Sequence, residues 1–304
     1  MHSRSIIPFL LALVLAPLLQ GVINRVKAVF AGRRGPPLLQ SYFDLWKLAR
    51  KGAVYSRTTT WLFRAGPVVG LAAVTLAAML MPLGDCPSLV AFPIDFLLFA
   101  CLLGLARFVT VLAALDTGSS FEGMGASREV LFSALAEPAL LLALATQARH
   151  TAALSLSAMF GQPASIQYTD YAPVLALLAL ALMILLLAEN ARIPVDDPNT
   201  HLELTMIHEV MVLDHGGPDL AMILYGSALK LWLFAALVVG VVLPATGDAR
   251  LDLVLAIAGV LSVAVVVGVV ESIMARLRML IVPQLLVGAG ALAATAFLLA
   301  LKLN

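Results

Sequence analysis

Eight long apolar stretches run through this chain of 304 residues, and they constrain its fold more than any other feature. The hydrocarbon layer of a membrane is roughly 30 Å thick and a helix rises about 1.5 Å per residue, so about 20 apolar residues span it. We therefore predict an all-α polytopic membrane protein with eight transmembrane helices, forming a single integral membrane domain over residues 1–304. The predicted spans are 6–23, 62–83, 92–115, 129–148, 172–188, 220–244, 251–275 and 279–301.

The composition excludes the other broad classes of protein. Apolar residues make up 62% of the chain and charged residues only 12%, whereas an average soluble protein is about one quarter charged. The net charge of +1 gives no basic field that would attract nucleic acid. Cys86 and Cys101 are the only cysteines, too few to ligate an iron-sulfur cluster or a cysteine-rich zinc site. We therefore expect a chain in the lipid bilayer that carries no metal and no cofactor of its own.

The distribution of lysine and arginine predicts the orientation, because cytoplasmic loops carry the excess of these residues. Loops after the first, third, fifth and seventh spans hold twelve of them, and the opposite side holds four. The first stretch lacks an A-x-A cleavage site and contains Pro8 and Pro17, so we interpret it as a span rather than a signal peptide. We therefore predict a multi-pass protein of the cell inner membrane with both termini on the outer side.

Two of the inner loops are predicted to contain helices of their own. Over residues 38–51 the apolar side chains recur at helical spacing, which is typical of an amphipathic helix lying in the membrane surface. In the loop after the fifth span, Asp197 and Pro198 form a good N-cap and first-turn pair for a helix that runs to about Leu213.

Ionisable side chains within the spans are the most informative residues, because each costs roughly a few kcal/mol at bilayer depth unless it faces protein or water. Arg107, Glu137 and Lys230 lie roughly 13, 12 and 16 Å from the inner ends of their predicted spans, close to the middle of the membrane. Three further groups are expected nearer the inner surface or at its rim. These are Glu189, Glu271 and the neighbours Arg128 and Glu129.

Two interpretations of these charges remain open. They could form structural ion pairs, in which Arg107 or Lys230 neutralises Glu137 or Glu271 and holds the bundle together. Acids at graded depths also suit a carrier of protons, because burial and neighbouring cations bring carboxyl pKa values toward neutrality. Our hypothesis is a hydrated proton path from the inner surface to the membrane centre. It is lined by Glu129, Glu137, Glu189 and Glu271 and tuned by Arg107 and Lys230.

Three histidines recur every seven residues in the loop after the fifth span, at His201, His208 and His215. On a helix they would share one face. A shared metal ion is improbable, because His201 and His208 would be roughly 10 Å apart along the axis. The face is interpreted either as a solvated, partner-facing surface or as a surface for docking or proton relay, since histidine titrates near neutral pH.

Several linked motifs resemble the respiratory complex I subunit 1 family (NuoH in bacteria). The segment 33–47 is similar to the family's R-x-G-P-x-x-L-Q-x-x-x-D-x-x-K stretch, and the segment 189–196 matches its E-x-x-R-x-P-x-D signature. The segments 115–119, 125–129, 137–138 and 271–278 are similar to the hydrogenase branch, which includes formate hydrogenlyase subunit 4 and hydrogenase-4 component C. The sequence departs from the family after Pro194, where acids of the quinone-reducing members are lost and His201 is gained.

The resemblance implies a membrane subunit that is not catalytic alone, and that connects a peripheral electron-transfer arm to proton-pumping subunits. The implied partners are the hydrogenase large and small subunits, an iron-sulfur subunit and antiporter-like membrane subunits, with iron-sulfur clusters and a nickel-iron centre in those partners. The residues implied in docking, with the two histidines added, are Arg33, Arg34, Gly35, Pro36, Gln40, Asp44, Lys47, His201 and His208. The implied coupling residues are Asp116, Arg128, Glu129, Glu137, Glu189, Arg192, Asp196, Glu203 and Glu271.

We therefore predict the anchor and proton-coupling subunit of a membrane-bound nickel-iron hydrogenase of the hydrogenase-4 type. The main alternative is the quinone-site subunit of a complex I type NADH dehydrogenase. A stand-alone cation transporter is a third possibility, and it would remain active after removal of all partners.

Overall fold

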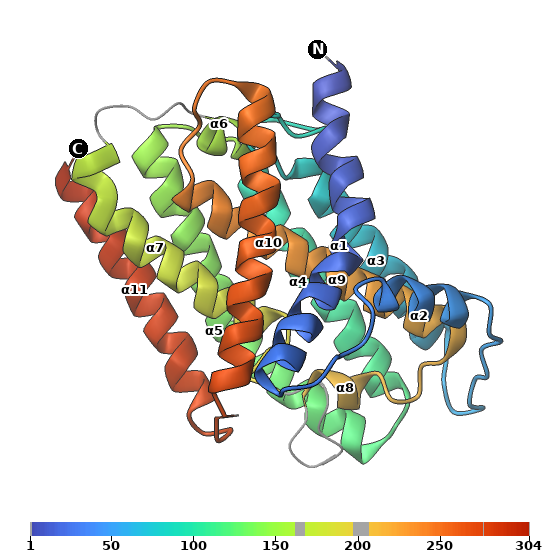
Figure 1. Cartoon of the computed structure of the whole chain (residues 1–304). Helices are drawn as coiled ribbons and strands as arrows, with labels where there is room; N and C mark the ends of the chain where they lie inside the picture. The colour runs from blue at the N-terminus through green and yellow to red at the C-terminus, as the bar shows by residue number, and fades with distance from the viewer. Residues whose placement is uncertain (1, 162–167, 197–206, 276, 304) are drawn as a thin grey trace.

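The chain folds into a bundle of long helices, seen in a computed structural model that describes residues 2–161, 168–196, 207–275 and 277–303 (Figure 1). Helices connected by short loops and turns account for these residues, and none of them lies in a β-strand. The helices are α1 (His2–Phe30), α2 (Gln40–Ala49), α3 (Trp61–Leu80), α4 (Asp95–Asp116), α5 (Ser120–Thr151), α6 (Leu156–Phe160), α7 (Tyr168–Glu189), α8 (His208–Met211), α9 (Gly217–Val242), α10 (Ala249–Ile273) and α11 (Val282–Leu303).

Eight of these helices are long and apolar enough to cross a membrane, which confirms the predicted fold class. They are α1, α3, α4, α5, α7, α9, α10 and α11. The largest error is at α5, which begins at Ser120 rather than at residue 129. Its first turns are polar, so hydropathy excludes them from a span although they continue the helix. The helix predicted over residues 38–51 is present as α2, at Gln40–Ala49, and none of its residues is buried.

Only the second half of the predicted helix from Asp197 to Leu213 can be compared with the structure, because residues 197–206 lie outside the described part of the chain. The described part contains α8, which ends at Met211, two residues before the predicted end. We refer below to the end of the bundle that carries α8 and the turn between α4 and α5 as the α8 end. The short helix α6 and the N-terminus lie at the opposite end (Figure 1).

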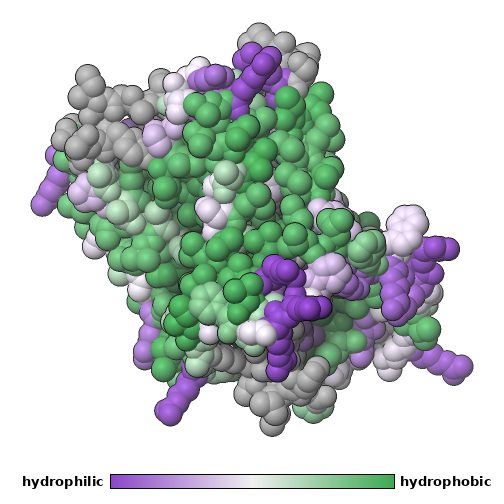
Figure 2. Space-filling view, viewed as in Figure 1, coloured by the Kyte–Doolittle hydropathy of each residue, from purple (hydrophilic) through white to green (hydrophobic). Residues whose placement is uncertain are grey.

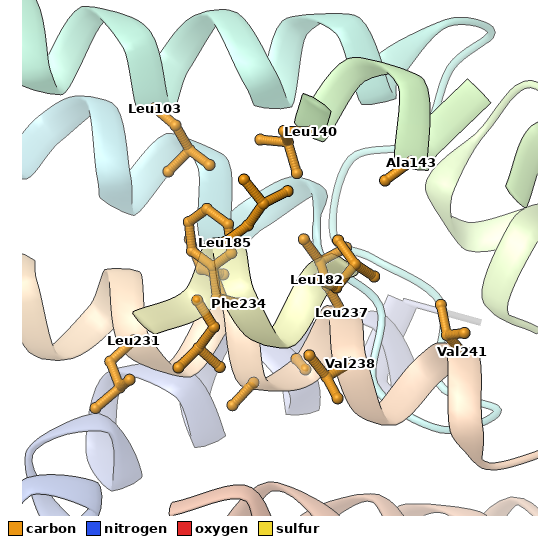
Figure 3. Close-up of a cluster of buried hydrophobic side chains, with 14 of the residues drawn as sticks. Leu103, Leu140, Ala143, Leu182, Leu185, Leu231, Phe234, Leu237, Val238 and Val241 are labelled. Atoms are coloured by element: carbon orange, nitrogen blue, oxygen red, sulfur yellow. The ribbon is translucent and has the colours of Figure 1, made fainter. Parts of the chain in front are cut away.

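The core of the bundle lies between α7 and α9. In the most apolar stretches of α7 and α9, 56% of the residues are buried, whereas the value for α4 and α11 is 28%. Helices α7 and α9 are therefore the most enclosed of the eight. Leu182 and Leu185 of α7 pack beside Phe234 and Leu237 of α9, with Leu140 of α5 close by (Figure 3). Around this pair, α11 packs on α5 and α7, α3 packs on α4 and α9, and α1 packs on α9 and α10.

The surface of the bundle matches a membrane environment. Apolar side chains cover most of its middle, whereas hydrophilic side chains gather around α2 and toward the two ends (Figure 2). Leu10, Val14, Phe108 and Leu298 are among the large apolar side chains exposed on the spanning helices. Exposed apolar surface of this extent would be unfavourable in water and is stable against lipid.

Tyrosines from two other helices complete the backbone hydrogen bonding of α1. Pro17 lacks an N–H group, so it leaves the carbonyl of Leu13 without its helical donor. The hydroxyl of Tyr225 in α9 donates to this carbonyl at 2.8 Å, and the hydroxyl of Tyr42 in α2 donates to the next one, that of Val14. These bonds fasten α1 to α9 and α2.

Candidate functional site

Six ionisable side chains from five helices meet inside the bundle and form what we call the central network. Arg107 comes from α4, and Glu129 and Glu137 come from α5. Glu189 is the last residue of α7, Lys230 lies in α9, and His208 begins the short helix α8. The sequence predicted that these charges, apart from His208, share a region of the membrane, and the structure brings all six side chains together.

Arg107 is the centre of the network because its guanidinium faces three carboxylates. Its Nε lies 3.4 Å from Oε1 of Glu129, and its Nη1 lies 3.4 Å from Oε1 of Glu137. Its Nη2 donates to Oε2 of Glu189. The arrangement is therefore branched, because one guanidinium contacts three carboxylates instead of forming a single ion pair.

The other two basic groups extend the network on either side of Arg107. Nζ of Lys230 lies 2.8 Å from Oε2 of Glu189, so this carboxylate is shared by two cations. Nε2 of His208 lies 3.3 Å from Oε2 of Glu129. Three carboxylates thus face two permanent cations, and the network is electrically neutral only when His208 is protonated.

Exposure differs sharply between the middle of the network and its ends. The exposed fraction of the side chain is 8% for Arg107, 6% for Glu129 and 5% for Glu189. It rises to 29% for His208 and 48% for Glu137. The network is therefore enclosed in its middle, and two of its side chains are more exposed, His208 in α8 and Glu137 on α5.

A second cluster of charges surrounds Glu271 of α10, whose side chain is fully buried. Its Oε2 lies 2.8 Å from Nζ of Lys27 in α1, and its Oε1 lies 3.4 Å from Nη1 of Arg192, in the turn after α7. Nη2 of Arg192 also donates to Oε1 of Gln20 in α1. Burial lowers the pKa of Arg192, and the Glu271 carboxylate opposes that effect. The predicted path residue Glu271 thus lies in this second cluster.

Two contacts hold α8 against α5 and place His208 beside Glu129. Oδ2 of Asp196 accepts hydrogen bonds from the backbone N–H groups of Ile207 at 3.1 Å and His208 at 3.3 Å. On the α5 side, a Cβ added to Gly125 would lie 2.9 Å from the carbonyl oxygen of Ile207, so the two backbones pack closer than any side chain would allow. Asp196, a predicted coupling residue, therefore fixes the start of α8.

Asp116, another predicted coupling residue, joins the end of α4 to the start of α3. Its Oδ2 accepts from the backbone N–H groups of Thr60 at 2.6 Å and Phe63 at 3.3 Å, and its Oδ1 accepts from the hydroxyl of Thr60 at 2.8 Å. It thus acts as an N-cap supplied by a distant part of the chain.

Substitution of Asp116 by alanine is expected to lower the free energy of unfolding by about 1–2 kcal/mol, the typical value of a lost N-cap. The matched variant Asp116→Asn keeps one acceptor oxygen, which can still accept from the backbone N–H groups of Thr60 and Phe63, and it should lose less. Thermal denaturation of the two purified variants measures the difference. Equal losses in both would contradict the capping role.

The remaining predicted residues are placed as follows. Arg33, Arg34, Gly35, Pro36 and Lys47 are exposed around the start of α2, where a partner could reach them. Gln40 donates to Asp44 at 2.8 Å on the same helix. Arg128 is partly buried on α5 next to Glu129. His215 does not continue the face of His208, because its ring stacks on Phe63 at a centroid distance of 3.9 Å. His201 and Glu203 lie outside the described residues.

Sequence reasoning missed four residues that build the two clusters. Gln20 is the one polar side chain within the otherwise apolar span predicted at 6–23, and this isolated polar position was a signal that the sequence offered. Lys27 was assigned to the loop after the first span, but α1 continues to Phe30. Gly104 and Gly125 gave no signal, because only the fold shows that a Cβ at Gly104 would lie 3.2 Å from Oε1 of Glu137. Within the described residues, no group of three or more histidines, cysteines, aspartates and glutamates is arranged to hold a metal ion.

Comparisons with known proteins agree with this architecture. The chain is 32% identical over 289 residues to formate hydrogenlyase subunit 4 of Escherichia coli (strain K12), covering 91% of this chain and 92% of that protein. It is also 32% identical over 277 residues to hydrogenase-4 component C of the same organism, covering 89% and 86%. In fold it is similar to a chain in the structure of the membrane-bound sulfane sulfur reductase, an archaeal respiratory membrane complex. That match has a TM-score of 0.82 at 22% identity and covers 98% of both chains.

The family comparison covers nearly the whole sequence. The NADH dehydrogenase family is matched over residues 4–301, a range that contains both charge clusters and all eight spanning helices except the last two residues of α11. The eight spans and the two hydrogenase-subunit relatives agree with the resemblance drawn from the motifs. The chain therefore belongs to the NADH dehydrogenase family of complex I subunit 1-like membrane proteins.

Proposed function

We propose that this chain is the membrane anchor and proton-coupling subunit of a nickel-iron hydrogenase complex of the hydrogenase-4 type. In this role it holds the peripheral electron-transfer arm and converts charge changes at that interface into proton movement through the central network. Electrons pass only through iron-sulfur clusters and a nickel-iron centre in partner subunits. The proposed location is the cell inner membrane, with both termini outside and the α8 end in the cytoplasm.

The observation that carries the proposal is the branched, enclosed arrangement of the central network. An isolated structural ion pair needs one acid and one base, whereas here Arg107 faces three carboxylates and Glu189 faces two cations. In a shared arrangement of this kind, a proton gained by one carboxylate changes the electrostatic potential at all the others. Such coupling between sites is what a proton-moving subunit requires.

The exposure of Glu137 supports a membrane partner on the face formed by α4 and α5. A carboxylate in a spanning helix with 48% of its side chain exposed would be costly against lipid. Phe108 of α4 and Val130 of α5 are also exposed on these two helices. We therefore place an antiporter-like membrane subunit here, and protons pass between it and the network at Glu137.

The exposed basic segment before and within α2 supports a partner at the α8 end. Arg33, Arg34 and Lys47 project from the chain beside the acidic Asp44. These side chains suit an interface with the hydrogenase large subunit, in which charge complementarity orients the partner. The hydrogenase small subunit and an iron-sulfur subunit would complete the peripheral arm.

The substitution Glu189→Gln tests the proton-coupling function. It keeps the size of the side chain but removes the charge that Arg107 and Lys230 share. We expect the assembled complex to retain hydrogen chemistry with an artificial electron carrier, while proton translocation in inverted membrane vesicles falls at least about tenfold. The matched control Glu122→Gln changes a buried carboxylate of α5 that lies outside the network, and its translocation should stay at the native rate. Native translocation by the Glu189→Gln complex would refute the function.

The hydrogenase assignment itself is tested by the composition of the purified complex. Both curated relatives at 32% identity are hydrogenase-type subunits, which supports hydrogenase chemistry over NADH oxidation. Nickel in the complex and hydrogen evolution are the expected findings. Bound quinone with NADH oxidation, in the absence of nickel, would assign the chain to an NADH dehydrogenase instead.

A further inference from the structure

We propose that His208 is the residue through which the central network exchanges protons with the α8 end of the molecule. This inference rests on the proposed proton-coupling function and identifies one terminus of the path. The sequence pattern left His208 open between docking and proton relay, and its position in the fold supports the relay.

The geometry of the imidazole ring suits a relay between the network and the outside. Nε2 faces Oε2 of Glu129 at 3.3 Å, whereas Nδ1 makes no hydrogen bond to any residue in the described part of the chain. The side chain of His208 is 29% exposed, against 6% for that of Glu129, although both ring nitrogens are themselves enclosed. His208 also lies in α8, outside the membrane spans, so it is the member of the network nearest to the partners or solvent at this end.

The position of the ring is built into the fold. Helix α8 has only four residues and no side-chain N-cap, so it depends on its neighbours for its place. The bonds from Asp196 to the backbone of Ile207 and His208 hold its start, and Gly125 lets it approach α5. The histidine therefore has a defined distance to Glu129 although it lies beside a loop.

Charged groups from all the elements around His208 decide its protonation. Burial lowers the pKa of the ring, but the Glu129 carboxylate at 3.3 Å and Asp196 together oppose burial, and the net effect raises the pKa of His208. Lys230 acts in the same direction as burial. Arg107, on the far side of Glu129, competes for the same carboxylate. The raised pKa favours the protonated ring, which is the state in which the network is neutral.

A proton can move through this pair with all atoms accounted for. The Nε2–H bond of the imidazolium breaks, an O–H bond forms at Oε2 of Glu129, and the ring becomes neutral with its remaining proton on Nδ1. The ring then changes tautomer, so that this proton leaves Nδ1 and one is bound at Nε2, and only after that does Nδ1 accept a proton from the α8 end. Because a protonated Glu129 no longer raises the pKa of the ring, the second proton is held more weakly than the first. The pair therefore passes charge in steps.

The sign of the pH dependence follows from the raised pKa of His208. The attraction between His208 and Glu129 is fully present below the usual pKa of histidine, and it is lost as the pH rises through the raised value. Proton translocation by the native complex should therefore decline on the alkaline side of neutrality. A variant without a titrating group at this position should lack that decline.

The test compares His208→Gln with the control His215→Gln in the intact complex. His215 lies outside the network and stacks on Phe63. The rate of proton translocation is measured from pH 6 to pH 9, roughly the range that brackets histidine titration. We expect His208→Gln to lower the rate at least about tenfold and to remove its alkaline decline. His215→Gln should keep the native rate and profile.

A second variant, His208→Lys, keeps the proposal testable if the glutamine variant does not assemble. Lysine supplies the positive charge that Glu129 needs but holds its proton through neutral pH, so it should restore assembly without restoring translocation. Native translocation by His208→Lys, or by an assembled His208→Gln complex, would overturn the assignment of His208. If Glu189→Gln still abolishes translocation in that case, the proposed coupling function survives. If Glu189→Gln is also active, the coupling function itself has failed.

Discussion

Substitution of Arg107 by methionine is expected to prevent stable assembly of the subunit. Arg107 is the cation that faces Glu129, Glu137 and Glu189, and its loss leaves two of these carboxylates enclosed with less compensation. Breaking one buried ion pair from one side typically costs about 3–5 kcal/mol, and a charge at membrane depth costs no less. The amount of assembled complex and its thermal dissociation temperature measure the loss.

Two further variants separate the charge effect from simple loss of packing. Arg64→Met removes an arginine of α3 that lies on the exposed ring face of Tyr55, at 4.2 Å from the ring centroid, and it should change stability by about 1 kcal/mol or less. The double variant Arg107→Met with Glu189→Gln removes one cation and one anion, so it should recover part of the assembly while translocation stays lost. A double variant no more stable than Arg107→Met alone would contradict this electrostatic explanation.

Substitution of Glu271 by leucine is expected to have the second largest effect. The fully buried carboxylate compensates both Lys27 and Arg192, so leucine leaves two cations facing each other inside the bundle. We expect a loss of about 3–5 kcal/mol in the free energy of unfolding. Thermal denaturation in detergent measures it.

The neighbouring substitution Lys27→Met is the matched control for Glu271. The side chain of Lys27 is 25% exposed, so Glu271 would keep Arg192 as its partner and the loss should be markedly smaller. A Glu271→Leu protein as stable as the Lys27→Met protein would mean that the second cluster contributes little to stability. In that case its charges would have to be explained by function alone.

The fold was predictable to a large extent because the bilayer imposes one strong rule on the sequence. A run of about 20 apolar residues in a chain with so few charges has few alternatives to a spanning helix, so all eight spans were found. The ends were less predictable, because a helix can continue past the apolar region. At α5, for example, Ser120 to Arg128 are polar on average, but they belong to the same helix as Glu129.

Apart from His208, the members of the central network were predicted from their positions along the spans, but most of their pairing was not. The position of a residue along its span gives its approximate depth, and this placed Arg107, Glu137 and Lys230 at one level. Depth says nothing about the direction in which a side chain points or about helix tilt. The sequence therefore could not show that Glu189 joins Arg107 to Lys230, nor that Glu271 pairs with Lys27.

Contacts between distant parts of the chain were beyond sequence reasoning altogether. Asp116 binds Thr60 and Phe63, more than fifty residues away, and no local pattern marks an N-cap of that kind. Gly125 is another example, because its close approach to Ile207 depends on how α8 folds back on α5. The heptad spacing of the histidines was misleading for a similar reason. Helix α8 ends at Met211, so His215 turns away to Phe63.

The turn that follows α7 links the two charge clusters mechanically. Glu189 belongs to the central network and Arg192, three residues later, belongs to the cluster around Glu271. Asp196, four residues farther on, is fastened to the backbone of His208. Residues 189–196 therefore join one ion pair of each cluster to the start of α8 within a single short stretch of chain.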